Sequence, residues 1–425
     1  MKTKAAVLSG KNNVYLRDFD LPQIGEEELL VRVVSNSVCL STYKAALRGP
    51  EHKRVPEDVA EHPAITGHEF AGYIEEVGEK LKDRFTPGER FALQPAMDLD
   101  SGYSAGYSYE TFGGNATYCI IPKVAIDLGC VLPYQDDYFV NASLAEPMSC
   151  IIGAFHATYH TENFDYEHKM GLKENGSVAL LGCSGPMGLG AVDYAVHGPY
   201  KSKRVVVTDI DEERLSRAAR LIRPEDAKED GVELIYINTR DAADPVEAIK
   251  AANDGEGYDE AFVFAAIPGL IEQADDLLGT DGCLNFFAGP TKNDFKAPFN
   301  FYNVHYERTH IVGTSGGSTG DMLESLQLSQ EGRINPSYMV THIGGLDAAP
   351  DTILNLTSIP GGKKVIYPHI SMPLTAISDF KELGKTNPLF SSLDTICEKN
   401  HGVWSGEAET CLLNYFGEED EARQE

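Results

Sequence analysis

The chain has 425 residues, 42% of them hydrophobic, and a formal net charge of −29 at pH 7. A strongly acidic surface repels nucleic acid and anionic membranes, and no apolar stretch is long enough to cross a bilayer, so neither partner is expected. The length favours two domains. The N-terminus lacks an apolar signal core and the eight cysteines form no CxxC pair, which indicates reduced thiols and a cytoplasmic protein.

Short alternating runs punctuated by Gly and Pro fill residues 1–155 and predict a β-rich, irregular domain. Residues 156–312 alternate apolar runs with helical stretches, which predicts an α/β domain with a parallel sheet covered on both faces. Its strands are expected at 177–183, 204–210, 232–237, 261–267, 283–289 and 309–315, and its clearest helices at 211–222 and 268–279. His156 and His160 are spaced i, i+4, and we expect both on the helix that enters this domain, in packing roles rather than as metal ligands. The last zone, 313–425, holds a helical stretch at 321–332 and a strand-like run at 363–370.

The stretch VALLGCSGPMGLGAVDYA, residues 178–195, runs from a strand through a glycine turn into a helix. Such a turn lets a pyrophosphate approach the backbone at a helix N-terminus. Gly185 and Gly188 fit the second and third glycines of the dinucleotide fingerprint, whereas Cys183 takes the first place, with Gly182 before it. The turn residues expected to bind the coenzyme are Gly182, Cys183, Gly185, Pro186, Met187 and Gly188.

The next strand ends in Asp209, 21 positions after Gly188. An acidic residue at that place accepts hydrogen bonds from the ribose of NAD and repels the extra phosphate of NADP. We therefore expect NAD(H) to be preferred over NADP(H). The alternative is that Asp209 and Asp211 cap the helix that follows, and both interpretations can hold together.

Four residues offer the groups that bind zinc: Cys39, His68, Glu69 and Glu146. A catalytic zinc has three protein ligands and one exchangeable position. The His-Glu pair lies in GHEFAG, where small neighbours let backbone and metal approach closely. Taken alone, Glu146 would more often be a surface or capping residue.

The segments CLS, GHEFAGYIEEVG, FTPGERF, AEPMSC and GPMGLGA stand in the order found in one family. Over roughly residues 1–370 the chain resembles the zinc-type medium-chain alcohol and polyol dehydrogenases. The resemblance implies a GroES-like catalytic domain (1–155 and 313–425) and a Rossmann domain (156–312) with a doubly wound parallel sheet. It implies one catalytic zinc per chain on Cys39 and His68, with Glu69 and Glu146 sharing the carboxylate roles. It also implies a homo-oligomer, either a dimer or a tetramer.

Two departures from the family pattern bear on chemistry. The lobe at about 93–122 has only Cys119, so the structural zinc that many relatives hold on four cysteines is not expected. Ser41 fits the hydroxyl that receives the substrate proton, but Lys44 stands where the family has a relay histidine. Ser41, Lys44 and Glu69 are the catalytic candidates, and the outer proton relay stays open.

Residues 44–54, which follow Cys39, form a basic segment in a chain that is otherwise strongly acidic. Lys44, His52, Lys53 and Arg54 are its candidates for contact with a substrate phosphate. The alternative is a solvated loop that makes surface ion pairs. Several segments resemble a bacterial subgroup, the L-sorbose 1-phosphate reductases, which reduce a ketose 1-phosphate to a hexitol phosphate. A sugar or polyol phosphate is therefore the expected substrate, and the alternatives are an unphosphorylated polyol or secondary-alcohol dehydrogenase and a non-enzymatic nucleotide-binding relative.

Overall fold

The chain divides into two units in a computed structural model that describes residues 1–424. The first unit combines Met1–Glu146 with Val340–Glu425, and the second is Pro147–Met339. The sequence placed the domain boundaries at 155/156 and 312/313, whereas the structure divides the chain at 146/147 and 339/340. In the second unit the side chain of Asn285 binds the carbonyl of Ala154, and His156 pairs with Asp321, so the end of α3 and the helix after 312 belong with the parallel sheet.

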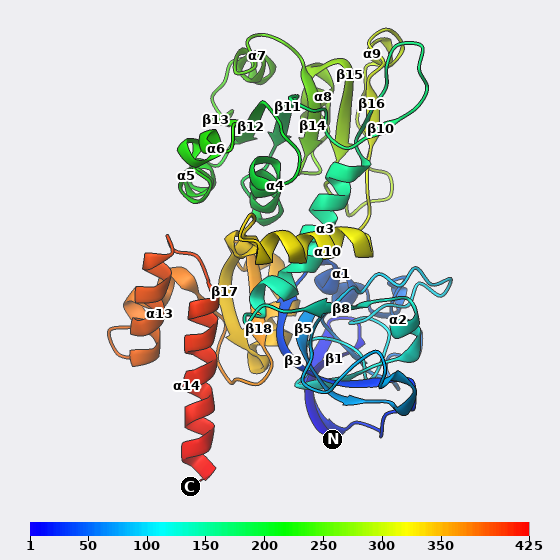
Figure 1. Cartoon of the computed structure of the whole chain (residues 1–425), viewed down its shortest axis with the longest axis vertical. Coiled ribbons are helices and arrows are strands. Elements are labelled where there is room, and N and C mark those ends of the chain that lie inside the picture. The colour runs from blue at the N-terminus through cyan, green and yellow to red at the C-terminus, as the bar shows by residue number, and fades with distance from the viewer. Residues whose placement is uncertain (425) are drawn as a thin grey trace. The chain divides into compact units, whose positions relative to one another are not determined.

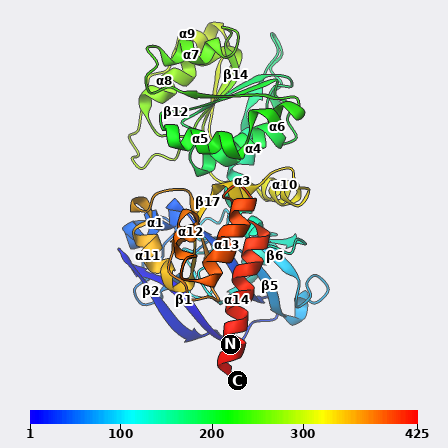
Figure 2. The same ribbon diagram turned by 90° about the vertical axis from the view of Figure 1, so that its left-hand side faces the viewer.

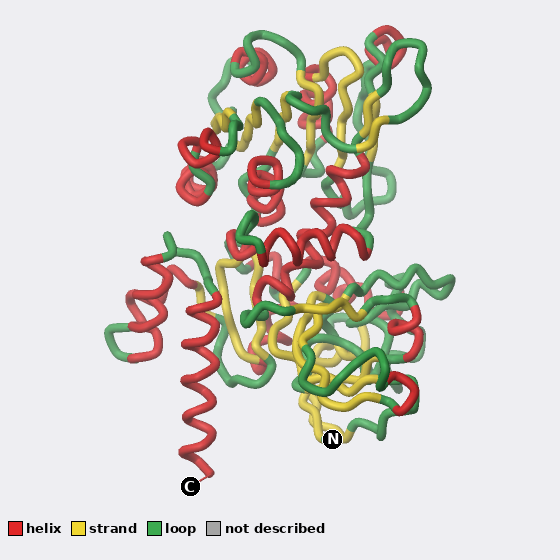
Figure 3. Tube along the Cα trace, viewed as in Figure 1, coloured by secondary structure: helices red, strands yellow, loops and turns green. Residues whose placement is uncertain are grey.

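The first unit is β-rich and irregular (Figure 3). Its larger sheet has eight strands in the order β19-β17-β18-β3-β5-β6-β8, with β7 paired to β3, and its smaller sheet has the order β2-β1-β4. The strands are β1 (Lys2–Gly10), β2 (Asn13–Asp20), β3 (Leu29–Val38), β4 (Ala64–Ile65), β5 (Glu69–Val77), β6 (Arg90–Leu93), β7 (Tyr118–Ile121), β8 (Val131–Tyr134), β17 (Val340–Gly345), β18 (Lys363–Tyr367) and β19 (Thr375–Ala376). The helices are α1 (Leu40–Arg48), α2 (Lys123–Asp127), α11 (Ala349–Leu354), α12 (Phe380–Leu383), α13 (Pro388–Lys399) and α14 (Gly406–Gln424), and α13 and α14 lie side by side (Figures 1 and 2).

Strand β3 is the central strand that leads to the candidate site. It is buried along nearly its whole length, and its apolar half packs into a core that includes Phe70 and Phe91. Residues 35–37 near its end are polar, and Ser37 pairs in register with Glu69 of β5 on one side and with Val365 of β18 on the other. Three segments that are far apart in the sequence therefore meet where β3 ends.

The second unit is a parallel sheet in the order β13-β12-β11-β14-β15-β16. Its strands are β11 (Ser177–Leu181), β12 (Arg204–Asp209), β13 (Glu233–Asn238), β14 (Tyr258–Val263), β15 (Leu278–Phe286) and β16 (His310–Val312), beside a hairpin of β9 (Tyr159–His160) and β10 (Lys169–Met170). The helices are α4 (Pro186–His197), α5 (Glu212–Leu221), α6 (Pro224–Glu229), α7 (Pro245–Ala251), α8 (Pro268–Leu277), α9 (Phe301–Tyr306) and α10 (Thr319–Gln330), and α3 (Val140–Ala157) leads into the unit. α4, α5 and α6 cover one face and α7 and α8 the other (Figures 1 and 2).

This strand order is that of a doubly wound nucleotide-binding fold, in which the order reverses between β11 and β14. The strands are mostly buried on both faces, as expected for a parallel sheet between two helix layers. The predicted α/β fold class, a β-rich domain plus a Rossmann domain, is confirmed. Among residues 1–424 no helix is both long and apolar enough to span a membrane.

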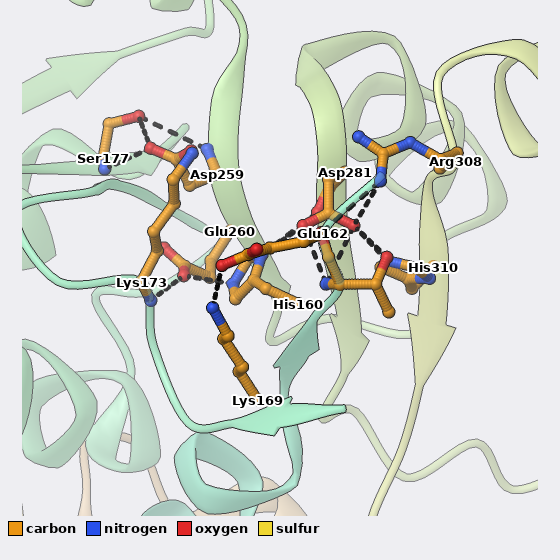
Figure 4. A network of polar contacts seen from close by, with 11 residues as sticks. His160, Glu162, Lys169, Lys173, Ser177, Asp259, Glu260, Asp281, Arg308 and His310 are labelled. Atoms are coloured by element: carbon orange, nitrogen blue, oxygen red, sulfur yellow. Dashed lines mark hydrogen bonds and ion pairs between the residues drawn. The ribbon is translucent and has the colours of Figure 1, made fainter. Parts of the chain in front are cut away.

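The prediction that His156 and His160 share one helix is wrong, because α3 ends at Ala157 and His160 lies on β9. His160 is buried, with Nε2 2.8 Å from a carboxylate oxygen of Glu260 and Nδ1 3.1 Å from the carbonyl of Asp281 (Figure 4). The Asp281 carboxylate also accepts hydrogen bonds from the segment after β9 and from β16. The two histidines thus belong to separate ion-pair networks that fasten the α3–β9 segment within this unit.

Candidate functional site

Cys39, His68 and Glu69 form one cluster, in which a ligand atom of each residue lies within 4.8 Å of those of the other two. Cys39 is the N-cap of α1, and His68 and Glu69 lie where β5 begins. His68 and Glu69 are almost completely buried. Within the described part of the chain, this is the one group of three or more His, Cys, Asp or Glu residues with the spacing of a metal site, and Glu146 is not among its members.

His68 is oriented for coordination through Nε2. Its Nδ1 lies 3.3 Å from the hydroxyl of Thr42, so the hydrogen carried by Nδ1 has an acceptor. Its Nε2 faces Ser41, at 3.4 Å, and Glu69, at 4.0 Å. Burial lowers the pKa of His68, which favours the neutral ring whose free lone pair can bind a metal.

Glu69 is one half of a buried ion pair. The ammonium of Lys363 lies 2.6 Å from each of its two carboxylate oxygens, and Ser37 donates a further hydrogen bond. Burial would raise the Glu69 pKa, but Lys363, His68 and the hydrogen bonds hold it below the usual value. Both oxygens of Glu69 are therefore already held by a cation.

Glu146 interacts electrostatically with the cluster residues Glu69, His68 and Cys39. Burial, together with the charges of Glu69 and Cys39, raises its pKa to about 8. If the thiol and both carboxyls are ionised, Lys363 leaves two negative charges uncompensated, and a divalent cation would neutralise them. Sulfur, imidazole and carboxylate groups in one largely buried cluster fit Zn²⁺.

Ser41 lies beside this cluster and takes part in a short hydrogen-bond chain. Its hydroxyl donates to the sulfur of Cys39 at 3.0 Å and accepts from the hydroxyl of Tyr107 at 2.8 Å. The ring of Tyr107 stacks on His68, with 4.8 Å between the ring centroids. No hydrogen bond joins Lys44 to Ser41 within residues 1–424, so the outer proton relay stays open.

The basic segment approaches the cluster through Arg54. The guanidinium carbon of Arg54 lies 5.2 Å from the ring centroid of Tyr107, and the ring of His52 stacks on the same tyrosine with 5.9 Å between the centroids. Burial and the charges of Arg54, Arg48, Lys53 and Lys44, in that order, lower the pKa of His52 to about 4, so His52 is neutral in the free protein.

The cations of this segment differ in their surroundings. Lys44 and Arg54 are half-buried, whereas Lys53 is exposed. None of the three forms an ion pair within the described chain. Lys53 also lines a surface pocket of about 580 Å³ that carries the carboxylates of Glu51, Glu57 and Asp58, which is a poor setting for an anion.

In the second unit, the glycine turn joins β11 to α4 at the C-terminal edge of the sheet. Gly182 has a φ of +63°, so the left-handed position lies one residue before Cys183, as the missing first glycine suggested. Gly188 has no room for a side chain, since a Cβ atom there would lie 2.0 Å from the carbonyl oxygen of Cys183. Gly185 is the N-cap of α4, which then begins with Pro186 and Met187.

Asp209 folds back onto this turn instead of capping the next helix. Its Oδ2 accepts hydrogen bonds from the backbone nitrogen and the hydroxyl of Ser184, at 3.1 and 2.5 Å. Its Oδ1 accepts from the backbone nitrogens of Ile210 and Asp211, at 2.8 and 3.1 Å. Asp211 is the cap of α5. A ribose hydroxyl would therefore have to replace one of these donors, most simply the hydroxyl of Ser184, which can turn about its Cβ–Oγ bond.

Sequence reasoning missed four residues that contact the predicted ligands: Ser37, Thr42, Tyr107 and Lys363. Lys363 had the strongest signal, because a lysine at the start of an apolar strand is rarely buried without a partner. Thr42 directly follows Ser41 and had no distinguishing feature. Tyr107 is one of twenty tyrosines, and its place in an irregular lobe gives no periodic pattern.

Comparison with known proteins matches both parts of the chain to family models. Residues 25–131 match the alcohol dehydrogenase GroES-like domain, and residues 186–331 match the zinc-binding dehydrogenase domain. A mannitol-1-phosphate 5-dehydrogenase of Aliivibrio fischeri is 66% identical over 98% of both chains. An L-sorbose 1-phosphate reductase of Klebsiella pneumoniae is 42% identical over 97% of both chains.

Solved structures agree at the level of the fold. The crystal structure of a zinc-binding dehydrogenase from Sinorhizobium meliloti, bound to NADP, has a TM-score of 0.69 and 21% identity. The match covers 87% of this chain and all of that one.

Proposed function

This chain belongs to the zinc-type medium-chain polyol dehydrogenase family, and on that basis we propose that it transfers hydride between a nicotinamide coenzyme and a ketose or polyol phosphate. The predicted oxidoreductase is confirmed by this membership, which argues against the non-enzymatic alternative. The phosphorylated substrate is supported by the names of the two relatives and, in this chain, by the position of Arg54 over Tyr107.

Cys39 and His68 are proposed to hold the zinc. Glu69 belongs to their cluster, but Lys363 already binds both of its oxygens, so Glu146 is proposed as the carboxylate ligand and Glu69 as a neighbour of the metal. When bound, zinc polarises the substrate oxygen and the nicotinamide carries the hydride. Ser41 exchanges the substrate proton, since its hydroxyl lies 3.0 Å from one proposed ligand and 3.4 Å from another. Lys44 keeps only an electrostatic role in this proposal.

Arg54 is the residue that ties the phosphate to this site. Its side chain lies over the ring whose hydroxyl binds Ser41, so a phosphate on Arg54 is held within reach of the reacting carbon. Lys44 adds a second positive charge, and phosphate binding would favour protonation of His52. Lys53 contributes least, because three acidic residues line the same surface pocket.

The test is a substrate panel with the zinc-loaded chain. The two relatives' names point to mannitol 1-phosphate and L-sorbose 1-phosphate, and fructose 6-phosphate is the ketose that oxidation of the former at carbon 5 gives. Each is compared with its free sugar or polyol. Equal kcat/KM for phosphorylated and free forms would favour the alternative, an unphosphorylated polyol or secondary-alcohol dehydrogenase.

The variant R54M separates the phosphate contact from general effects. Loss of a charge-assisted contact of this kind costs about 1.5–3 kcal/mol, so kcat/KM for the phosphorylated substrate should fall about 10- to 100-fold. Activity on the free polyol should change little. R17M is the matched control, because Arg17 also lies over an aromatic ring, that of Phe19, at 5.1 Å. Equal losses on both substrates would contradict the phosphate role.

NAD(H) is proposed as the preferred coenzyme, supported by Asp209 at the end of β12. The carboxylate stands beside the glycine turn, where it would repel the extra phosphate of NADP. Its present partners include the hydroxyl of Ser184, which can rotate away and leave an acceptor for the ribose.

A homo-oligomer is proposed as well, supported by the free edge of the parallel sheet. β16 is the edge strand, and its Ile311 is exposed. Large exposed apolar side chains flank it on α9 and on the β9–β10 hairpin: Phe301, Tyr302, Tyr306, Phe164, Tyr166 and Met170. Edges of this kind pair with a second copy or aggregate. I311K should lower the mass in light scattering if this edge is the interface, and an unchanged oligomer would contradict that placement.

A cytoplasmic location is proposed from the cysteines alone. All eight are free in the structure, which suits a reducing compartment.

A further inference from the structure

We propose that Tyr107 is a positioning residue for the reaction, which holds the hydroxyl of Ser41 and strengthens it as a proton donor. The inference rests on the proposed function, because it gives Tyr107 a role in the same site. Tyr107 lies outside the family motifs described above. Its hydroxyl binds Ser41, whereas Lys44, which stands where the family has a relay histidine, forms no hydrogen bond to Ser41 among the described residues.

The hydroxyl of Tyr107 has two polar neighbours, Ser41 and, farther away at 3.4 Å, Nε2 of His68. Tyr107 is 1% exposed, and its hydroxyl lies 2.8 Å from the serine oxygen. The serine hydrogen is directed to the sulfur of Cys39, at 3.0 Å. Tyr107 is thus the donor, and the orientation of the Ser41 hydroxyl is set from both sides.

The tyrosine ring has little freedom to move. One contact is the ring of His68, at 4.8 Å between centroids and 28° between planes, and another is the ring of His52, at 5.9 Å and 6°. The guanidinium of Arg54 lies over the ring as well. Because packing restricts the ring, the position of the Tyr107 hydroxyl is fixed closely enough to orient a catalytic group.

This geometry favours proton donation by Ser41 in the reductive direction. As carbonyl reduction proceeds, negative charge grows on the substrate oxygen. The Ser41 O–H turns from the Cys39 sulfur to that oxygen, its bond breaks as the substrate O–H bond forms, and the serine oxygen then regains a proton from solvent. Until then, charge develops on the serine oxygen, where the Tyr107 hydroxyl already points. A preorganised donor at the place where charge develops lowers the barrier without binding the ground state more tightly.

The variant Y107F removes only the hydroxyl and keeps the stacked ring. In the zinc-loaded enzyme, kcat for ketose-phosphate reduction should fall about 10- to 100-fold, as expected for a lost hydrogen bond to a developing charge. KM for both substrates and the zinc content should stay within about twofold, and the solvent deuterium isotope effect on kcat should rise. Y109F is the matched control, because Tyr109 lies in the same lobe and has no contact with Ser41 among the described residues.

The S41A background distinguishes positioning from a general structural effect. If Tyr107 acts through Ser41, Y107F should cost little activity once the serine hydroxyl is gone. Equal losses in the two backgrounds, an unchanged kcat in Y107F, or a loss of zinc that accounts for the lost activity would each overturn the inference. A wild-type enzyme inactive on every sugar and polyol of the panel would instead overturn the proposed function.

Discussion

The buried pair of Lys363 and Glu69 gives the sharpest prediction about stability. Both side chains are nearly inaccessible, at 8% and 0%, and the ammonium lies 2.6 Å from each carboxylate oxygen. The variant K363M leaves Glu69 as a buried carboxylate without its cation. Breaking a buried pair in this way costs about 3–5 kcal/mol.

The change should appear as a lower melting temperature of the metal-free protein. For a unit of this size, each kcal/mol corresponds to about 2–4 °C, so K363M should melt about 6–20 °C below the wild type. The double variant K363M/E69Q should recover most of that loss, because the neutral amide needs no buried cation. Differential scanning calorimetry, or circular dichroism at a fixed heating rate, would measure the shift.

Lys364 provides the matched comparison. It is the next residue on β18 and is also buried, but its ammonium donates to the backbone carbonyls of Ile359, Pro360 and Gly362 rather than to a carboxylate. K364M should therefore destabilise the protein by an amount that E69Q does not change. The ion-pair reasoning is refuted if K363M melts within about 2 °C of the wild type, or if E69Q rescues K364M as well as it rescues K363M.

Three further predictions concern the metal, the coenzyme and pH. E146Q should lower zinc affinity more than E69Q, because Lys363 already holds both oxygens of Glu69, and chelator competition that gives the reverse order would contradict the assignment. D209A should lower the ratio of kcat/KM for NADH to that for NADPH by about tenfold, and an unchanged ratio would refute the role of Asp209. Burial raises the pKa of Glu409 to about 7 from 4.5, so its contribution to stability is present below about pH 4.5 and is lost as pH rises through about 7. Between pH 5 and 8, the unfolding free energy of E409Q should therefore decline by about 3 kcal/mol less than that of the wild type. Denaturant titrations at several pH values measure this, and the same pH dependence in both proteins would contradict the prediction.

The secondary structure and the glycine turn of the second unit could be predicted, because each depends on a short contiguous stretch of sequence. The strands and helices of the second unit followed from apolar periodicity, and its glycine turn followed from spacing. The positive φ of Gly182 also fitted the displaced glycine pattern. The position of His160 could not be predicted, because nothing in its neighbours marks Ala157 as the end of α3.

The sequence alone determined which residue types are available as zinc ligands, the strand–glycine turn–helix pattern of the proposed coenzyme loop and the sign of the basic segment. Only the tertiary structure decided which groups meet: Lys363 with Glu69, across almost three hundred residues, and Tyr107 with Ser41. These encounters depend on the register between β18, β3 and β5 and on the path of an irregular lobe. Sheet register follows from the packing of the whole unit, and no local pattern specifies a partner hundreds of residues away.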